Sequence, residues 1–340
     1  MVKINTEIEK LTYNGAYKIY GKILTTDVKE RLDTELNLII ENNFENYYLI
    51  AQKLAKEANE NGYIVGTRGA VASSLVSYCL GITEIDPIKY NIPFETFAGI
   101  NGNKKPDIVL TFSKEYEIKA QENLKIILNN LESKNSLKIN IMVQDELSTL
   151  KKLEDVTGIS HNNINVTDDK ILDLFRKNLD TKGLFEFNAT FAEELIKKVK
   201  PLNVDELIKI SAILHGTGLW KNNIEKLIEK HNSNEIACTR DDIYLYLLQK
   251  GINSEIAFNI MEFVAKGKIQ LSKYKEEWNS YINIMNEYNI PKWYITSLEK
   301  NKYMFPKAHC CNSIILNLYL AWYKVYYPKE FIEITSRSKT

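Results

Sequence analysis

The 340-residue sequence has few of the residues that define several protein classes. Its four cysteines form no CxxC pair, so we expect neither a disulfide framework nor a structural zinc site. Seven prolines and 14 glycines leave little room for long loops. No apolar run reaches the roughly 18 to 20 residues that a membrane span needs, and the charged start MVKINTEIEK predicts no secretory signal. These absences favour a cytoplasmic protein with reduced thiols and no membrane partner.

Net charge is also absent, because 44 Lys and Arg balance 44 Asp and Glu. This balance excludes a strongly basic nucleic-acid coat protein but allows a local basic groove. The 44% hydrophobic content supplies enough apolar side chain for a core, which excludes a disordered chain. Arginine, the fork-shaped binder of phosphates and carboxylates, occurs only at positions 31, 68, 176, 240 and 337.

Helical periodicity dominates the sequence, and short strand patterns occur only near its start. We expect strands at 63–65, 108–112 and 137–143, with helices at 27–42, 47–61, 70–79 and 114–131. Later helices are expected at 145–156, 168–178, 190–199, 204–214, 221–231, 240–250, 254–265, 272–288, 292–300 and 311–327. The fold class is therefore α+β and predominantly helical. A small mixed-sheet region, 1–144, precedes an all-helical region, 145–340.

The first candidate site is the glycine-containing turn from Gly66 to Ser74, placed between a strand and a helix. Glycines let the backbone approach a ligand closely, and a helix N-terminus presents N–H groups to an anion. Arg68 and the hydroxyls of Ser73 and Ser74 could add phosphate hydrogen bonds. The segment matches neither nucleotide-loop fingerprint, so from the spacing alone a tight strand-to-helix turn with small packing residues is the favoured interpretation.

The second candidate is Asp107, just ahead of strand 108–112. A carboxylate at a strand end is suited to Mg²⁺, but two-metal catalysis needs at least two converging carboxylates. Side chains two apart on a strand share a face, and position 109 is Val109. From the residues alone, Asp107 is more simply a surface carboxylate.

A third, scattered polar set lies in the helical region. Asp241 and Asp242 are typical first-turn helix acids, and His215 with Gly216 is typical of a helix C-terminus. These groups are more often structural than functional. The set comprises His215, Arg240, Asp241, Asp242, Lys307 and His309.

Several ordered segments together resemble one known family. They are Val65–Ser74, ITEIDP (82–87), IPFETFAG (92–99), PDIVLTFSKEY (106–116), HGTGLW (215–220), CTRDDIYLYL (238–247) and KYMFPKAH (302–309). Together they resemble the polymerase core of the PolC-type bacterial DNA polymerase III α subunit, a C-family polymerase. The resemblance runs nearly from end to end.

The resemblance implies dNTP addition to a primer 3′ end by two Mg²⁺ held on three aspartates. The first matches Asp107, while the other two positions hold Val109 and Asn140. In the nucleotide loop, Ala70 and Ala72 replace a serine and a glycine of the family. The nucleotide-binding residues that it implies are Gly66, Arg68, Gly69, Ser73, Ser74, Arg240, Lys307 and His309.

The resemblance also implies missing parts. Only 32 residues separate Asp107 from Asn140, where the family has the rest of the palm and the thumb that grips duplex DNA. The family's zinc insertion is reduced to a few residues, 86–91. We therefore expect residues 1–144 to form a truncated palm and residues 145–340 to form the fingers.

These substitutions predict a PolC-like replication protein that lacks polymerase activity and holds no Mg²⁺ productively. At most it binds dNTP, DNA or replisome proteins weakly. One alternative is an active minimal polymerase in which Asp107 works with Asp145 or a nearby Glu. Another is a non-enzymatic decoy or regulator that competes for replisome contacts, and a relic without function is the last.

Overall fold

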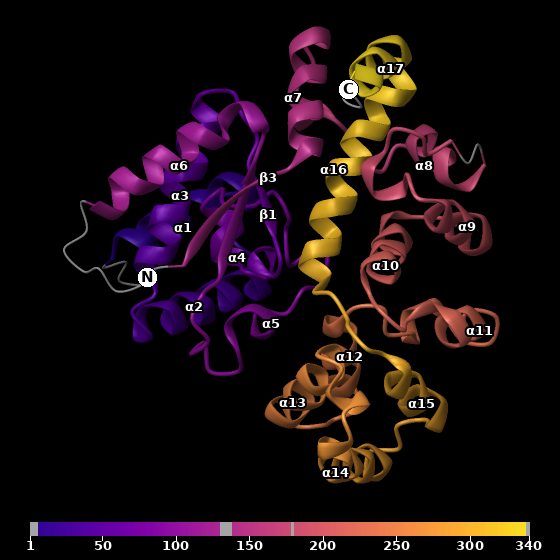
Figure 1. The fold of residues 1–340 in the computed structure, drawn as a ribbon. Coiled ribbons are helices and arrows are strands. Elements are labelled where there is room, and N and C mark those ends of the chain that lie inside the picture. The colour runs from indigo at the N-terminus through magenta and orange to yellow at the C-terminus, as the bar shows by residue number, and fades with distance from the viewer. Residues whose placement is uncertain (1–5, 130–137, 178–179, 338–340) are drawn as a thin grey trace.

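The computed structural model describes residues 6–129, 138–177 and 180–337 (Figure 1). The first half contains the helices α1 (Glu7–Tyr20), α2 (Thr26–Glu41), α3 (Glu45–Glu60), α4 (Leu75–Cys79), α5 (Glu95–Ala98) and α6 (Lys114–Asn129). Its strands are β1 (Gly66–Arg68), β2 (Ile108–Phe112) and β3 (Ile139–Val143). The predicted α+β, predominantly helical fold class is confirmed.

The second half of the described chain is helical throughout. Its helices are α7 (Asp145–Thr157), α8 (Asp169–Arg176), α9 (Thr190–Val199), α10 (Val204–His215), α11 (Glu225–Leu227), α12 (Arg240–Gln249), α13 (Ser254–Ala265), α14 (Lys275–Glu287), α15 (Lys292–Lys300), α16 (Lys307–Tyr326) and α17 (Pro328–Arg337). Over the described ranges, no helix has the length and apolar character to cross a membrane.

The three strands form one mixed sheet in the order β1-β2-β3. β1 runs antiparallel to β2, and β3 runs parallel to β2. Parallel neighbours need a crossover connection, which α6 supplies. In this register Val109 lies opposite Arg68 on one side and Asn140 on the other.

The sheet has one buried face and one partly open face. Ile108, Leu110 and Phe112 alternate along β2 and are fully buried, because α3 and α6 pack on their side. The opposite face carries Val109 and Asn140, which are only partly covered. The positions that the resemblance assigns to metal binding therefore lie on the open face.

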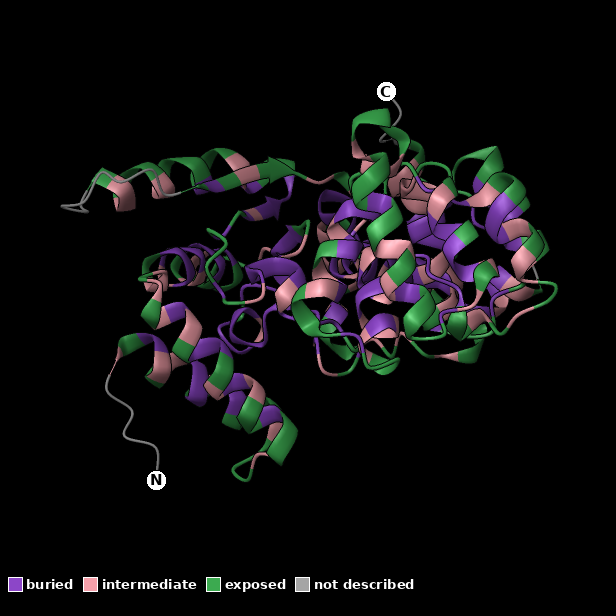
Figure 2. Cartoon of the chain, turned by 90° about the horizontal axis from the view of Figure 1, so that it is seen from below, coloured by how far each residue is buried: buried purple, intermediate pink, exposed green. Residues whose placement is uncertain are grey.

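Two hydrophobic cores form, one largely in each half of the chain. The first extends from Ile8 to Ile139, and the second is built mainly from α7 onward. Residues of the first half that join the second core are Ile64, Ala72, Ile85, Tyr90 and Ile92. Figure 2 shows buried and exposed faces alternating around the helices, as amphipathic packing requires. The domain boundary at residue 144 stays a prediction.

Helix α16 runs between the first-half elements and the remaining helices (Figure 1). It contacts β1 on one side and α7, α8 and α10 on the other. It begins at Lys307, one turn earlier than predicted, directly after Pro306. A proline at this point fixes φ near its helical value and needs no backbone donor. One buried helix thus carries side chains to both halves.

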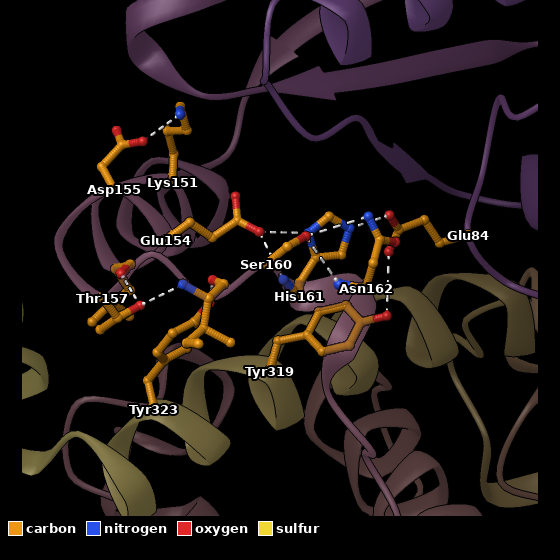
Figure 3. A network of polar contacts seen from close by, with 12 residues as sticks. Glu84, Lys151, Glu154, Asp155, Thr157, Ser160, His161, Asn162, Tyr319 and Tyr323 are labelled. Carbon is orange, nitrogen blue, oxygen red and sulfur yellow. Dashed lines mark hydrogen bonds and ion pairs between the residues drawn. The ribbon is translucent and has the colours of Figure 1, made fainter.

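A second junction is centred on His161 (Figure 3). Its Nε2 lies 2.7 Å from Glu84 of the first half, and its Nδ1 lies 2.7 Å from Glu154 of α7. The Tyr319 hydroxyl of α16 donates to the same Glu84 at 3.4 Å. Burial lowers the pKa of His161, but hydrogen bonds to the two carboxylates outweigh it and raise the pKa to about 9. His161 is therefore an imidazolium paired on both sides.

One helix was missed, and three predicted elements were wrong in detail. Helix α1 was not predicted, although Thr6 and Glu9 form a capping box at its start. The strand expected at 63–65 lies at Gly66–Arg68, because Gly66 is the residue that pairs with Thr111. The helix expected at 70–79 breaks at Ser74, whose extended backbone (φ −94°, ψ 122°) starts α4.

The helix expected at 221–231 is instead an irregular turn followed by the short α11. Asn222 adopts a left-handed backbone (φ 59°) there, which ends any regular helix. The ends of other predicted ranges, at 130–131, 137 and 178, lie outside the described residues.

Candidate functional site

A pocket of about 470 Å³ opens where β1 and the start of β2 face the second half. It gathers five of the nine predicted site residues: Arg68, Gly69, Asp107, Arg240 and His309. We call it the cationic pocket. Its other walls are Ala70, Phe97, Lys104, Val109, Tyr303, Phe305 and Pro306.

The cationic pocket has more positive than negative charge. Arg68, Lys104 and Arg240 line it together with a single carboxylate, Asp107. Partial burial, and then the neighbouring Arg240, lower the pKa of Lys104. A cation whose charged form is disfavoured in this way gains from a bound anion. The arrangement is therefore suited to an anionic ligand.

Arg240 is held firmly yet is not fully satisfied. Its Nη2 donates to the Thr96 carbonyl at 2.6 Å, and its Nη1 lies 3.7 Å from Glu262. Its Nε is buried and has no hydrogen-bond partner among the described residues. An orphaned buried donor costs free energy, so it marks a place where a ligand acceptor would be stabilising.

Asp241 supports the pocket from behind, although the sequence identified it only as a first-turn helix acid. As predicted, it lies in the first turn of a helix, but it is fully buried. Its carboxylate accepts from the Thr96 hydroxyl at 2.8 Å and from the Lys307 backbone N–H at 2.7 Å. Burial raises the pKa of Asp241. The Asp241 carboxylate therefore fixes the start of α16 against α5. No sequence signal distinguishes a buried first-turn acid of this kind from an exposed one.

The predicted nucleotide loop divides into two parts. Arg68 and Gly69 line the cationic pocket, but Gly66 lies inside β1 and does not. A Cβ at Gly66 would stand 2.4 Å from the Thr111 hydroxyl oxygen, so this glycine serves strand pairing. The role of Gly66 in nucleotide binding stays a prediction.

Ser73 and Ser74 are completely buried and point away from the pocket. The Ser74 hydroxyl donates to Glu35 at 2.8 Å, and that carboxylate also accepts from the Leu75 and Val76 N–H groups. Ser73 lies 3.3 Å from the Thr96 hydroxyl. The N–H groups that we expected to bind phosphate are therefore bound to a carboxylate of the protein itself.

Lys307 lines a different pocket from Arg240. It lines a separate pocket of about 520 Å³ together with Lys89 and Lys209. Its backbone N–H is already bonded to Asp241, which lies between α5 and α16. Lys307 thus does not line the cationic pocket, although Pro306 beside it does.

The three positions of the predicted metal site do meet. Val109 and Asn140 are paired across β2 and β3, and Asn140 Nδ2 donates to Asp107 Oδ1 at 3.4 Å. This set offers one carboxylate, one amide whose nitrogen faces that carboxylate, and one alkyl group. It does not fit two divalent cations, which need several anionic oxygens. In the described parts of the chain, no three His, Cys, Asp or Glu side chains group as a metal site.

A smaller pocket of about 230 Å³ adjoins the cationic pocket and shares two of its residues, Arg68 and His309. We call it the polar pocket. Its other walls are Thr111, Val143, Gln144, Asp145, Glu146, Glu186, His215, Asn312 and Ser313. Asp145, which the sequence offered as a second catalytic acid, lines this pocket and not the one that Asp107 lines.

A buried network forms the back of the polar pocket. Glu186 accepts from the hydroxyls of Ser211 and Ser313 and lies 3.2 Å from His215 Nε2. Burial alone would raise the pKa of Glu186, but these contacts lower it. Burial and the neighbouring His215 lower the pKa of His309 to about 4. His309 is thus neutral and accepts from the Gly69 N–H at 3.5 Å through Nδ1.

Comparisons with known proteins match most of the chain. Residues 6–216 match the family described as "Bacterial DNA polymerase III alpha NTPase domain". The chain is 29% identical to the PolC-type DNA polymerase III of Caldanaerobacter subterraneus subsp. tengcongensis, covering 96% of this chain and 33% of that protein. It is 27% identical to the PolC-type enzyme of Bacillus subtilis, covering 94% and 32%.

The chain therefore spans about a third of the length of the relatives that it matches. The alignment with the first of them has 473 positions, more than the 340 residues of the chain. The relative thus carries segments inside the matched region that this chain lacks. Because the family match covers residues 6–216, more than half of the chain, the chain belongs to the bacterial DNA polymerase III α family.

Proposed function

We propose that this protein binds nucleoside triphosphates through the cationic pocket but does not catalyse templated DNA synthesis. The main support for this proposal is that the two sides of the cationic pocket differ: the anion-binding side is complete and the metal-binding side is not. The anion-binding side has Arg68, Lys104 and Arg240. The metal-binding side has Asp107 hydrogen-bonded to Asn140, with Val109 beside them.

The affinity for a triphosphate rests on the two arginines. A guanidinium donates two parallel hydrogen bonds to phosphate oxygens, and charge-assisted bonds are roughly twice as strong as neutral ones. Arg240 contributes a buried Nε–H that no described residue accepts. Arg68 is exposed and lines the pocket, and its guanidinium forms no hydrogen bond or salt bridge with the described residues. Both guanidinium groups therefore have donors to offer.

The absence of synthesis rests on the charge of the metal side. Phosphoryl transfer depends on cations that neutralise charge developing on the transferred group. Two divalent cations placed beside Asp107 would meet one negative charge, since Asn140 is neutral and Val109 has no donor. The active minimal polymerase with Asp107 and Asp145 is less favoured, because the two carboxylates line different pockets.

The remaining parts of the proposal concern the setting of the protein. We place it in the cytoplasm among replication proteins, in weak contact with DNA or with replisome partners. Support comes from the family alone. A pull-down from cells, followed by mass spectrometry, tests whether any replication protein is retained and so weighs the decoy or regulator alternative.

The binding proposal is tested by titrating a dNTP into the purified protein in EDTA, which removes metal effects. Wild type, Arg240→Ala and Arg68→Ala are compared, with Lys29→Ala as a control on an exposed lysine of α2. We expect each arginine variant to lose at least tenfold in affinity while the control keeps it, since one charge-assisted hydrogen bond contributes about 1.5 to 3 kcal/mol. Equal affinities in all four proteins, or none, contradict the proposal.

A further inference from the structure

The polar pocket has chemistry that the cationic pocket lacks. The two pockets share Arg68 and His309, so they lie side by side. The Arg68 side chain between them is exposed, so a ligand is able to displace it. Their volumes of about 470 and 230 Å³ together suit a ligand of nucleotide size, since pockets for such ligands hold roughly 300 to 1,000 Å³.

Two amide groups offer hydrogen-bond donors to the polar pocket. Asn312 is only 7% exposed, and its Oδ1 accepts from the Thr67 N–H at 3.5 Å. Its Nδ2 bonds to no described residue. Gln144 accepts from the Thr111 hydroxyl at 2.6 Å through Oε1, which leaves its Nε2 likewise without a described partner. A side chain more than nine-tenths buried thus presents an unpaired donor to the pocket.

Two carboxylates offer acceptors to the same pocket. Asp145 and Glu146 open α7 and line the pocket beside the amides. Neither forms a salt bridge with a side chain in the described ranges. Burial raises the pKa of Glu146, although a backbone hydrogen bond and the nearby Arg68, which lines the same pocket, lower it. The pocket therefore combines amide donors without a described partner with carboxylate acceptors that form no salt bridge.

Aromatic rings complete the pocket. His215 and His309 line it with ring centroids 5.0 Å apart, and Phe305 of the cationic pocket lies 5.0 Å from His309. His309 is only 8% exposed, so it offers a bound base a small, uncharged edge of the pocket wall.

We propose that the polar pocket binds the guanine base of a nucleoside triphosphate whose phosphates lie in the cationic pocket. Guanine carries acceptors at O6 and N7, which match the amide groups of Asn312 and Gln144. Its N1–H and its amino group are donors, which match the carboxylates of Asp145 and Glu146. Adenine and cytosine place a lone pair where guanine has N1–H, so a carboxylate disfavours them. This inference rests on the proposed function.

The test is calorimetric titration of the whole protein in EDTA with GTP, ATP, CTP and inorganic tripolyphosphate. The variant Glu146→Gln replaces the acceptor by an amide of the same shape. Glu193→Gln is the matched control, because this glutamate lies exposed in the first turn of α9. If Glu146→Gln does not fold, Asp145→Asn takes its place. Thermal melting of each variant verifies the fold.

We expect GTP to bind at least tenfold more tightly than ATP, CTP and tripolyphosphate. Glu146→Gln should remove this preference and leave tripolyphosphate binding unchanged, while Glu193→Gln should alter neither. Equal binding of all four ligands overturns the base pocket but leaves the proposed function standing. Preference for GTP that survives in Glu146→Gln and Asp145→Asn also overturns it. No binding of tripolyphosphate or any nucleotide overturns both proposals.

Discussion

Asn140 Nδ2 donates to Asp107 Oδ1 at 3.4 Å, across the start of two parallel strands. The amide stands where the family resemblance calls for a second carboxylate beside Asp107. An amide facing a carboxylate forms a hydrogen bond without a metal, whereas two carboxylates at this separation repel each other unless a cation lies between them. We therefore propose that this pair holds the starts of the two strands together without a cation.

Restoring the carboxylates should restore a need for metal. The variant Val109→Asp/Asn140→Asp places three aspartates together, and their repulsion should lower its melting temperature in EDTA. Mg²⁺ or Mn²⁺ should then raise it, because binding to the folded state alone adds about 2.7 kcal/mol at a hundredfold excess over Kd. Wild type should show no such rise. A metal-dependent rise of equal size in wild type would contradict the account.

The same variant separates two causes of inactivity. If the missing internal segment alone prevents synthesis, restored metal binding brings no primer extension. Extension by the double variant, absent in wild type, would assign the loss to Val109 and Asn140 alone.

Glu35 should be more important for stability than its place on a surface helix suggests. It is fully buried and accepts from Ser74, Leu75 and Val76 while it pairs with Arg31 at 2.6 Å. Glu35→Ala leaves those donors and the guanidinium unpaired, so we expect a loss of about 3 to 5 kcal/mol in urea unfolding. Glu30→Ala, on the exposed face of the same helix, should change stability by less than about 0.5 kcal/mol.

The sequence predicted the elements that obey simple periodicity. The strand 108–112 and the helices 27–42 and 47–61 follow from patterns of two and of 3.6 residues, and the structure places them within a residue or two. The first strand lies three residues later than predicted, at Gly66–Arg68. The resemblance likewise predicted that Asp107, Val109 and Asn140 meet. Local sequence patterns did not predict element boundaries that depend on contacts between residues far apart in the chain. The break at Ser74 depends on Glu35, which lies 39 residues away, and no window around residues 70–79 contains that information.

The residues of the candidate site were likewise predicted only where long-range contacts do not decide their positions. Arg68 was predicted from its chemistry and Arg240 from the family resemblance, and the fold brings them to one pocket. Asp241 was predicted as a first-turn acid, but its burial was missed because exposed and buried first-turn acids look alike in a sequence. Lys307 was assigned with Arg240, yet the backbone bond from Lys307 to Asp241 orients α16 so that its side chain faces another pocket.

Stability should fall at alkaline pH because of His161. Its pKa is raised to about 9 from an unfolded value of about 6.5 by Glu84 and Glu154. The stabilisation is therefore complete below pH 6.5 and is lost as pH rises through 9, a change of up to about 3 kcal/mol. Urea unfolding between pH 6 and 10 measures it. His161→Gln should flatten this dependence, and an unchanged slope in that variant would contradict the assignment.

Asp241 should act as the link between α5 and α16. Asp241→Ala removes an acceptor from Thr96 and from the Lys307 N–H, both in buried surroundings. We expect a loss of about 3 kcal/mol, because hydrogen bonds to charged groups contribute roughly 1.5 to 3 kcal/mol each. Asp205→Ala, which removes an exposed first-turn acid of α10, is the matched control and should have little effect. Equal effects would show that burial of Asp241 is unimportant.

Primer extension by the purified protein tests the central claim most directly. A primed template, the four dNTPs and either Mg²⁺ or Mn²⁺ are supplied, and Asp107→Ala is assayed in parallel. We predict no templated product from either protein, because Asp107 lies beside Asn140 and Val109 and not beside other carboxylates. Templated extension by the wild type that disappears in Asp107→Ala would contradict the account.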